Sequence, residues 1–156
     1  MKKFELTTDS IKRNGVTLYR IKSLIDFEDV KAGDLGGYVE KEENLSQYGD
    51  AWAFDDAQVY GNACVYGNAC VCDNARVVGN ARLSGDADYI HLKEFGSHNR
   101  NTTMFREENG NIYVSCGYFS GTLQEFESKV KETHGNSEFA REYLALVEAA
   151  KIHFEV

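Results

Sequence analysis

Residues 49–87 read GDAWAFDDAQVYGNACVYGNACVCDNARVVGNARLSGDA, and an alanine recurs in them at every sixth position. Gly or Asp stands two residues before each alanine, and Asn or Asp stands immediately before it. A fixed short period of this kind predicts a repeat architecture. The alanines of the period are Ala51, Ala57, Ala63, Ala69, Ala75, Ala81 and Ala87.

Each repeat unit can be written V-x-G-N-A-x, as in Val59–Cys64. We expect the Val and Ala side chains to point inward and Gly-Asn to form the bend, because both bend residues tolerate unusual φ/ψ angles. The pattern resembles that of the hexapeptide-repeat, left-handed parallel β-helix family. The resemblance implies a triangular prism with three hexads per coil, in which residues 18 apart stack on strands about 4.8 Å apart. Val59 would then lie over Val77, and Val65 over Leu83.

An aromatic band is predicted on the outside of the first half of the repeat. Aromatic side chains on a thin prism are not expected to face only water. We therefore expect this band to pack against the flanking segments or to bind a partner, including another copy of the chain in a homo-oligomer. The residues of the aromatic band are Tyr48, Trp52, Phe54, Tyr60 and Tyr66.

The charge of the chain restricts its partners. The 156 residues carry a formal net charge of −8 and no long run of Lys or Arg. Direct binding to a nucleic-acid duplex is therefore not expected, because it requires a basic surface. No segment approaches the ~18 consecutive apolar residues of a membrane span, and the N-terminus lacks the apolar core of a secretory signal. We expect a cytoplasmic protein with no membrane association.

The cysteines are expected to be reduced thiols, because the chain shows no export signal. Cys70 and Cys72 flank Val71 and so share one strand face, and Cys64 lies one corner away. Three thiolates could bind zinc, but no fourth ligand has the spacing of a zinc ribbon. Neither a metal nor another cofactor is therefore predicted.

Residues 1–45 are predicted to form an N-terminal β-hairpin and a cap for the repeat. Asn14-Gly15 separates two β-prone runs, which is a strong hairpin signal because both residues tolerate positive φ. A glycine-rich stretch at residues 32–39 could cradle a phosphate, but its spacing is not that of a P-loop. The favoured interpretation is that Leu35, Val39 and Leu45 form irregular first turns of the repeat, since terminal repeats are atypical.

The fold class expected from the whole chain is mainly β with an α+β C-terminal part. Residues 46–92 are predicted to be the hexapeptide-repeat β-helix, with residues 89–92 closing its last turn. Residues 93–156 are predicted to be a ββαα unit, whose strands Thr102–Arg106 and Ile112–Phe119 form a hairpin. Thr122 with Glu125 fits a capping box for the first helix, Gly135 ends that helix, and Ser137 can cap the second.

The stretch Ser97–Thr103 is the best candidate binding site in the sequence. It offers arginine, histidine, amide and hydroxyl side chains without a carboxylate, a set that can hold an anion or a nucleotide phosphate. The alternative is a solvated connector. No catalytic residue is predicted, because no nucleophile with a base and an orienting group is evident around the histidine. The predicted ligand-binding residues are Ser97, His98, Asn99, Arg100, Thr102 and Thr103.

The whole layout resembles hexapeptide-repeat proteins with YGNA repeats from phages and prophages. The resemblance is carried by LYRIKSLIDFEDVKAGDLGGYVEKEENLS at residues 18–46, by the YGNA repeats, and by SCGYFSGTLQEFESKVKETHG at residues 115–135. It implies a phage-type protein acting in the cytoplasm of a bacterial host. By analogy, we expect a non-enzymatic protein that inhibits a host defence system, either by sequestering a nucleotide signal or by occluding a defence protein.

Two alternative functions stay open. The chain could be a structural or assembly β-helix module that uses its aromatic band. It could also be an acyltransferase, as most enzymes of the hexapeptide-repeat family are. Those enzymes need a base, usually a histidine, near a groove between neighbouring prisms. Here all four histidines, His91, His98, His134 and His153, lie outside the coils, so enzymatic activity is not expected.

Overall fold

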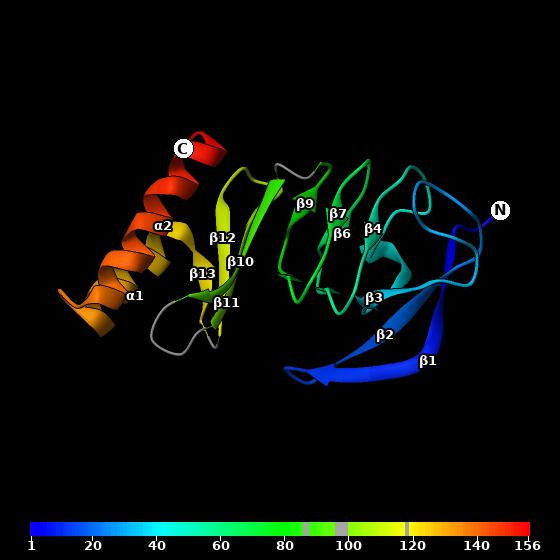
Figure 1. The fold of residues 1–156 in the computed structure, drawn as a ribbon, viewed down its shortest axis with the longest axis horizontal. Helices are drawn as coiled ribbons and strands as arrows, with labels where there is room; N and C mark the ends of the chain where they lie inside the picture. The colour runs from blue at the N-terminus through cyan, green and yellow to red at the C-terminus, as the bar shows by residue number, and fades with distance from the viewer. Residues whose placement is uncertain (86–87, 96–99, 118) are drawn as a thin grey trace. The chain divides into compact units, whose positions relative to one another are not determined.

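The structure is a computed structural model that describes residues 1–85, 88–95, 100–117 and 119–156. The chain forms two compact units, Met1–Asp86 (unit 1) and Ala87–Val156 (unit 2) (Figure 1). Unit 1 contains an N-terminal hairpin and the repeat, and unit 2 contains an antiparallel sheet followed by two helices. None of the helices in the described ranges combines the length and the apolar character that crossing a membrane requires.

The N-terminal hairpin is formed by β1 (Phe4–Arg13) and β2 (Val16–Ser23). Its two-residue turn pairs Arg13 with Val16, and Asn14 and Gly15 have φ angles of 52° and 79°. Positive φ at both central positions is the geometry that matches the twist of a tight hairpin, so the Asn-Gly prediction is confirmed. β2 also pairs antiparallel with β3 (Leu35–Val39), which joins the hairpin to the repeat.

Six two-residue strands build the repeat as three parallel pairs. β4 (Trp52–Ala53) pairs with β7 (Cys70–Val71), β5 (Gln58–Val59) with β8 (Arg76–Val77), and β6 (Cys64–Val65) with β9 (Arg82–Leu83). Val59 lies opposite Val77 and Val65 opposite Leu83, which confirms the predicted offset of 18 residues. The inward Ala, Val and Leu residues of these hexads are buried, so the core of unit 1 runs along the axis of the coil.

The first coil is longer than the later ones. Val39 pairs with Val59 and Leu45 bridges to Val65, so both are offset by 20 residues. The two additional residues lie between Leu45 and Gly49, just after a short 3-10 helix η1 (Glu42–Asn44). Val39 and Leu45 are buried as predicted, but Leu35 is 59% exposed, because it lies at the start of β3. The prediction that Leu35 joins the inward column is therefore wrong.

The glycine-rich stretch before the repeat lets β3 pack closely against the next coil and does not form a phosphate loop. Gly36 and Gly37 lie within β3 and are buried. A Cβ at Gly36 would lie 2.6 Å from the carbonyl oxygen of Ala53, and a Cβ at Gly37 would lie 2.4 Å from that of Ala57. Only glycine therefore lets β3 approach the next coil this closely.

Unit 2 contains a four-stranded antiparallel sheet in the order β10 (Tyr89–Phe95), β11 (Arg100–Arg106), β12 (Ile112–Cys116), β13 (Phe119–Thr122). The predicted hairpin of the β11 and β12 region is confirmed. The expectation that residues 89–92 close the last turn of the repeat is wrong, because they pair antiparallel with β11. Their alternation of polar and apolar side chains suits both a turn of the repeat and a strand of the antiparallel sheet, so the pattern alone could not distinguish these two structures.

Two helices follow the sheet, α1 (Leu123–His134) and α2 (Glu138–Phe154). Thr122 and Glu125 form the predicted capping box, Gly135 follows the last residue of α1, and Ser137 caps α2 by accepting a hydrogen bond from the Ala140 N–H. The apolar faces of both helices pack on the sheet in one core that includes Phe126, Tyr143 and Val147.

Candidate functional site

The predicted ligand-binding stretch is only partly described. Ser97, His98 and Asn99 lie outside the described residues, and Arg100 is described only as the first backbone position of β11. The structure therefore places Thr102 and Thr103 alone among the predicted ligand-binding side chains.

Thr102 and Thr103 are 0% and 2% exposed, because β11 is paired on both sides, with β10 and with β12. The Thr102 hydroxyl donates to Cys116 Sγ at 3.2 Å. The Thr103 hydroxyl lies 3.0 Å from His91 Nδ1. Both hydroxyls are thus engaged inside unit 2, and the prediction that they bind a ligand from solvent is corrected.

The covered part of the aromatic band lies under the N-terminal segment. Trp52 is 1% exposed and contacts Phe4 and Phe27 edge-to-face, with ring centroids 6.2 and 5.4 Å away. Tyr60 is 8% exposed, packs with Leu18, and its hydroxyl accepts a hydrogen bond from Asn14 Nδ2 at 3.2 Å. Trp52 and Tyr60 therefore pack against a flanking segment and cannot serve as partner-facing residues.

The open part of the aromatic band consists of Tyr48 and Tyr66, which are 85% and 40% exposed. Tyr48 lies in the two-residue enlargement of the first coil, and Tyr66 follows β6. Phe54 is intermediate in exposure. The side of the coil that carries β6 and β9 also presents Cys64 and Arg82 at intermediate exposure and an exposed Ser84. We call Tyr48, Cys64, Tyr66, Arg82 and Ser84 the open face.

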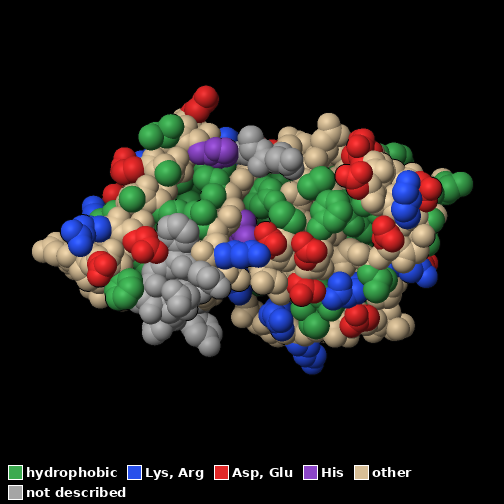
Figure 2. Space-filling view, viewed as in Figure 1, with side chains coloured by type: hydrophobic (Ala, Val, Ile, Leu, Met, Phe, Trp, Pro, Cys, Tyr) green, Lys and Arg blue, Asp and Glu red, His purple; other side chains and the backbone are tan. Residues whose placement is uncertain are grey.

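The chemistry of the open face is that of a contact surface. Burial raises the pKa of the Cys64 thiol, against the opposing effect of nearby Arg82, so this thiol stays protonated at neutral pH. A protonated thiol is a poor nucleophile. Acidic and basic side chains are interspersed on the side of the molecule drawn in Figure 2, with hydrophobic side chains between them. Tyr48 and Tyr66 add two solvent-accessible aromatic rings to the open face, and aromatic residues are enriched at protein interfaces.

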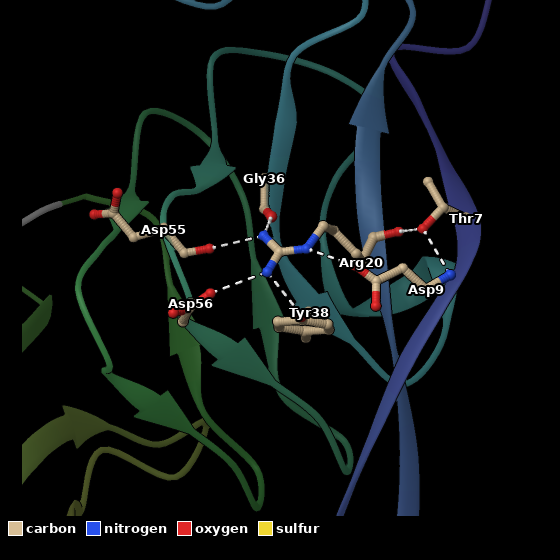
Figure 3. Close-up of polar contacts among 7 residues, drawn as sticks. All are labelled: Thr7, Asp9, Arg20, Gly36, Tyr38, Asp55 and Asp56. Carbon is tan, nitrogen blue, oxygen red and sulfur yellow. Dashed lines mark hydrogen bonds and ion pairs between the residues drawn. The ribbon is translucent and has the colours of Figure 1, made fainter.

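Arg20 is a highly connected polar residue of unit 1, and sequence reasoning missed it (Figure 3). It lies on β2, where polar and apolar side chains alternate on both faces, so the pattern gave Arg20 no role of its own. Its guanidinium lies 4.3 Å from the centroid of the Tyr38 ring, and its side chain is 18% exposed. Nε donates to Asp9 at 3.1 Å, Nη1 to the carbonyls of Gly36 at 2.8 Å and Asp55 at 3.3 Å, and Nη2 to Tyr38 Oη at 2.6 Å and Asp56 at 3.0 Å.

The Arg20 cluster is a clamp and does not bind an anion. An arginine side chain has five N–H donors, and all five are used by these acceptors. Burial alone would lower the pKa of Arg20, but the hydrogen bonds that it donates to Asp56, Tyr38 and Asp9 raise the pKa overall. The donors come from β2, and the acceptors come from β1, from β3 and from the corner at Asp55–Asp56, so Arg20 ties the hairpin to β3 and to the coil.

Lys3 plays a similar part at the preceding corner, around Gly49–Ala51. It is 1% exposed, and its ammonium donates to the carbonyls of Ala51 at 2.7 Å and Gly49 at 3.2 Å and lies 5.0 Å from the Phe27 ring centroid. Burial lowers the pKa of Lys3 to about 8, although the Asp50 carboxylate opposes the shift. A lysine with a pKa near 8 can act as a catalytic group in general, but this one is enclosed, with its ammonium held by two backbone carbonyls and the Phe27 ring.

Two amides complete the attachment of the N-terminal region. Gln47, in the enlarged first coil, accepts from the Lys3 and Phe4 N–H groups at 2.7 and 3.2 Å. Buried Asn44 donates to the carbonyls of Ala63 at 2.8 Å and Gly61 at 3.2 Å. Lys3, Arg20 and Asn44 thus supply the donors that a preceding coil would otherwise provide, which protects the first edge of the repeat.

Metal binding finds no support in the described part of the chain. None of the four cysteines forms a disulfide; Cys64, Cys70 and Cys72 are of intermediate exposure, and Cys116 is buried. Within the described ranges, no group of three or more His, Cys, Asp or Glu side chains is placed to hold a metal ion.

Comparison with known proteins gives one partial match. No protein-family model matches the chain. Over 52 residues, or 33% of its length, the chain is 40% identical to the protein described as "Uncharacterized acetyltransferase YdcK" of Escherichia coli (strain K12). Those residues are 16% of that protein, so the chain spans about a sixth of its length. The match supports a hexapeptide-repeat type of coil, and the phage origin stays a prediction.

Proposed function

We propose that this protein is a non-enzymatic binding protein that occludes a protein partner with the open face of its coil. The observation that carries the proposal is the contrast in exposure between Tyr66, at 40%, and Tyr60, at 8%, which occupy the same position of the hexad. The hairpin covers Tyr60 and leaves Tyr66 and Tyr48 available. Tyrosine is enriched at protein interfaces, because it contributes a large apolar ring and a hydroxyl at low entropic cost.

The proposed partner is a component of a bacterial host's defence. This choice rests on the resemblance of residues 18–46 and of the YGNA repeats to phage and prophage proteins. Occlusion of a protein has more support than sequestration of a nucleotide, since Thr102 and Thr103 are buried. A nucleotide site would now depend on Ser97–Arg100.

Site-specific photo-crosslinking in bacterial lysate tests the occlusion proposal. A photoreactive phenylalanine analogue at Tyr66 or Tyr48 should give a crosslinked adduct of defined mass that mass spectrometry identifies. The matched control carries the analogue at exposed Phe139 of unit 2, which is 42% exposed and outside the open face. Equal labelling from position 139, or no adduct from positions 48 and 66, would refute the use of the open face.

The nucleotide arm has its own test. Cyclic nucleotides and cyclic ADP-ribose isomers should raise the melting temperature of the protein if it sequesters such a signal. The increase should disappear in Arg100→Ala. No increase with any of these compounds would rule out this arm and leave the occlusion proposal standing.

Acetyl transfer is the second candidate, and the partial match to an acetyltransferase favours it. Its difficulty is the absence of a histidine before His91, so that unit 1 has no histidine to act as base. Incubation with acetyl coenzyme A and a mixture of amine acceptors should release no free thiol above the level of a heat-denatured control. Enzyme-dependent thiol release would replace the binding proposal with this one.

A further inference from the structure

Unit 2 contains a cavity of about 450 Å³ between the β11–β12 turn, the start of α1 and the end of α2. Its size is within the range of small-ligand sites, roughly 300–1,000 Å³. The side chains used below are Asn111, Ile112, Leu123, Gln124, Glu127 and Lys151, all of which line it. We propose that this cavity binds a small zwitterion of the amino-acid type that carries an apolar side group.

A pair of opposite charges stands on the wall of the cavity. Glu127 Oε2 of α1 and Lys151 Nζ of α2 are 3.5 Å apart, with side chains 23% and 36% exposed. Glu127 also meets Lys131 at 3.4 Å, and Lys151 meets Glu148 at 3.3 Å. All three contacts are longer than a charge-assisted hydrogen bond of 2.7–2.9 Å. The pair is therefore loosely held and can tighten on a ligand.

Both charged groups keep bonding capacity. An ammonium has three donors, and Lys151 uses two of them on Glu127 and Glu148 within the described residues. A carboxylate has about four acceptor sites, and Glu127 uses one on Lys131 and one on Lys151. One ligand amine and one ligand carboxylate can thus be added without an existing contact being broken.

The rest of the lining selects the kind of zwitterion. Ile112 and Leu123 are 4% and 7% exposed and belong to the core of unit 2, so they give the cavity an apolar floor. Asn111 and Gln124 contribute amide groups beside it. The ligand amine would meet Glu127, its carboxylate would meet Lys151, and its apolar group would lie on Ile112 and Leu123. A simple anion is disfavoured because Glu127 and Glu148 both flank the only lysine of the lining.

Titration of the intact protein with L-leucine, followed by amide chemical shifts, tests the proposal. We expect saturable shifts at residues 110–112 and 122–127. L-Leucinamide lacks the carboxylate and N-acetyl-L-leucine lacks the amine, so each should bind about tenfold or more weakly, the loss expected for one charge-assisted hydrogen bond. Glycine, which lacks the apolar group, should also bind more weakly than leucine.

Matched variants locate the site. Glu127→Gln and Lys151→Met should each weaken leucine binding about tenfold or more. Lys131 and Glu148 are the outer partners of Glu127 and Lys151 and do not line the cavity. Lys131→Gln and Glu148→Gln should therefore change the affinity for leucine less than about twofold. Circular dichroism confirms that each variant is folded. The proposal is overturned if leucine causes no saturable shift, if the blocked compounds bind equally well, or if the outer variants lose as much affinity as the inner ones. None of these outcomes bears on the open face of unit 1.

Discussion

The two tyrosines Tyr60 and Tyr66 occupy equivalent positions in neighbouring hexads, each directly before the glycine of a corner. Tyr60 is 8% exposed under the hairpin, whereas Tyr66 is 40% exposed on the open face. Their positions in the repeat are equivalent. Only the position of the N-terminal hairpin makes Tyr60 a core residue and leaves Tyr66 on the surface. In a coil of this kind, function is decided by what the flanking segments leave uncovered.

The same contrast holds for the polar groups. On the covered side, Lys3 and Arg20 donate hydrogen bonds to backbone carbonyls and carboxylates of the protein itself. On the open face, Tyr48 projects from the enlarged first coil with 85% exposure. The covered side therefore contributes stability, and the open face is the part of unit 1 suited to recognition.

The largest expected effect is on the covered side, at Trp52. Trp52→Ala removes a ring that is 1% exposed and packed against Phe4 and Phe27. We expect the free energy of unfolding to fall by about 3–5 kcal/mol in urea denaturation. Tyr48→Ala, the control on the open face, should change it by less than about 0.5 kcal/mol. Similar losses of unfolding free energy for both variants would show that the covered side and the open face contribute equally to stability.

The next effect is the pH dependence set by Lys3. Its folded-state pKa of about 8 lies below its ordinary value of 10.5. Between these values the unfolded chain binds more protons than the folded chain, so stability rises with pH across that window. The rise from pH 7 to 10.5 should approach about 3 kcal/mol, at 1.36 kcal/mol per pH unit.

Lys3→Met is the control for that pH dependence, because tyrosines and cysteines also titrate in the same range in both proteins. The difference in unfolding free energy between the two proteins should change steadily from pH 8 to 10.5. A difference that stays constant would mean that the ammonium of Lys3 is not buried as described.

A smaller effect is expected at the corners of the coil. Gly67 has a φ of 63°, and a Cβ there would lie 2.6 Å from the Ser84 carbonyl oxygen. Gly67→Ala should therefore cost about 2 kcal/mol or more, from left-handed strain and the clash together. Gly15→Ala shares the positive φ but has nothing within 4 Å of the added Cβ, so it should cost only about 1 kcal/mol. Equal costs in urea denaturation would argue against the close stacking of successive coils.

The smallest effect on stability is expected at Tyr66, where the effect on binding should be large. Tyr66→Ser should change the free energy of unfolding by less than about 0.5 kcal/mol. If the open face binds a partner, the same variant should lose most of its co-purification with that partner. Ser84→Ala, on the same face but without a ring, should retain it. Retention by Tyr66→Ser would place the interface elsewhere.

Local signals in the sequence were sufficient for the architecture of the repeat and of several turns. The period of six, through its resemblance to the hexapeptide-repeat pattern with three hexads per coil, predicted the pairing of Val59 with Val77, and Asn14-Gly15 predicted the tight turn of the hairpin. Thr122 with Glu125 predicted the cap of α1. These features depend on residues close in sequence or on a strict repetition, so pattern and backbone preference contain the necessary information.

The candidate site was less accessible to sequence reasoning. Thr102 and Thr103 stood where the polar stretch meets the start of a predicted strand, but β10 pairs with β11 on its second edge and the two threonines are buried. Because residues 89–92 were assigned to the repeat, β10 was not predicted as a strand of unit 2. Antiparallel pairing between two strands is not specified by the alternation of either strand alone.

The sequence by itself determined the coil, its inward columns and the positions from which side chains point outward, because a six-residue period repeats the same backbone geometry at each turn. Only the tertiary structure decided which outward positions are covered. Arg20 meets Gly36, Asp55 and Asp56 at separations of 16 to 36 residues, and Lys3 meets Ala51 at 48. Contacts at such separations depend on where the hairpin lies on the coil, and no local period encodes that placement.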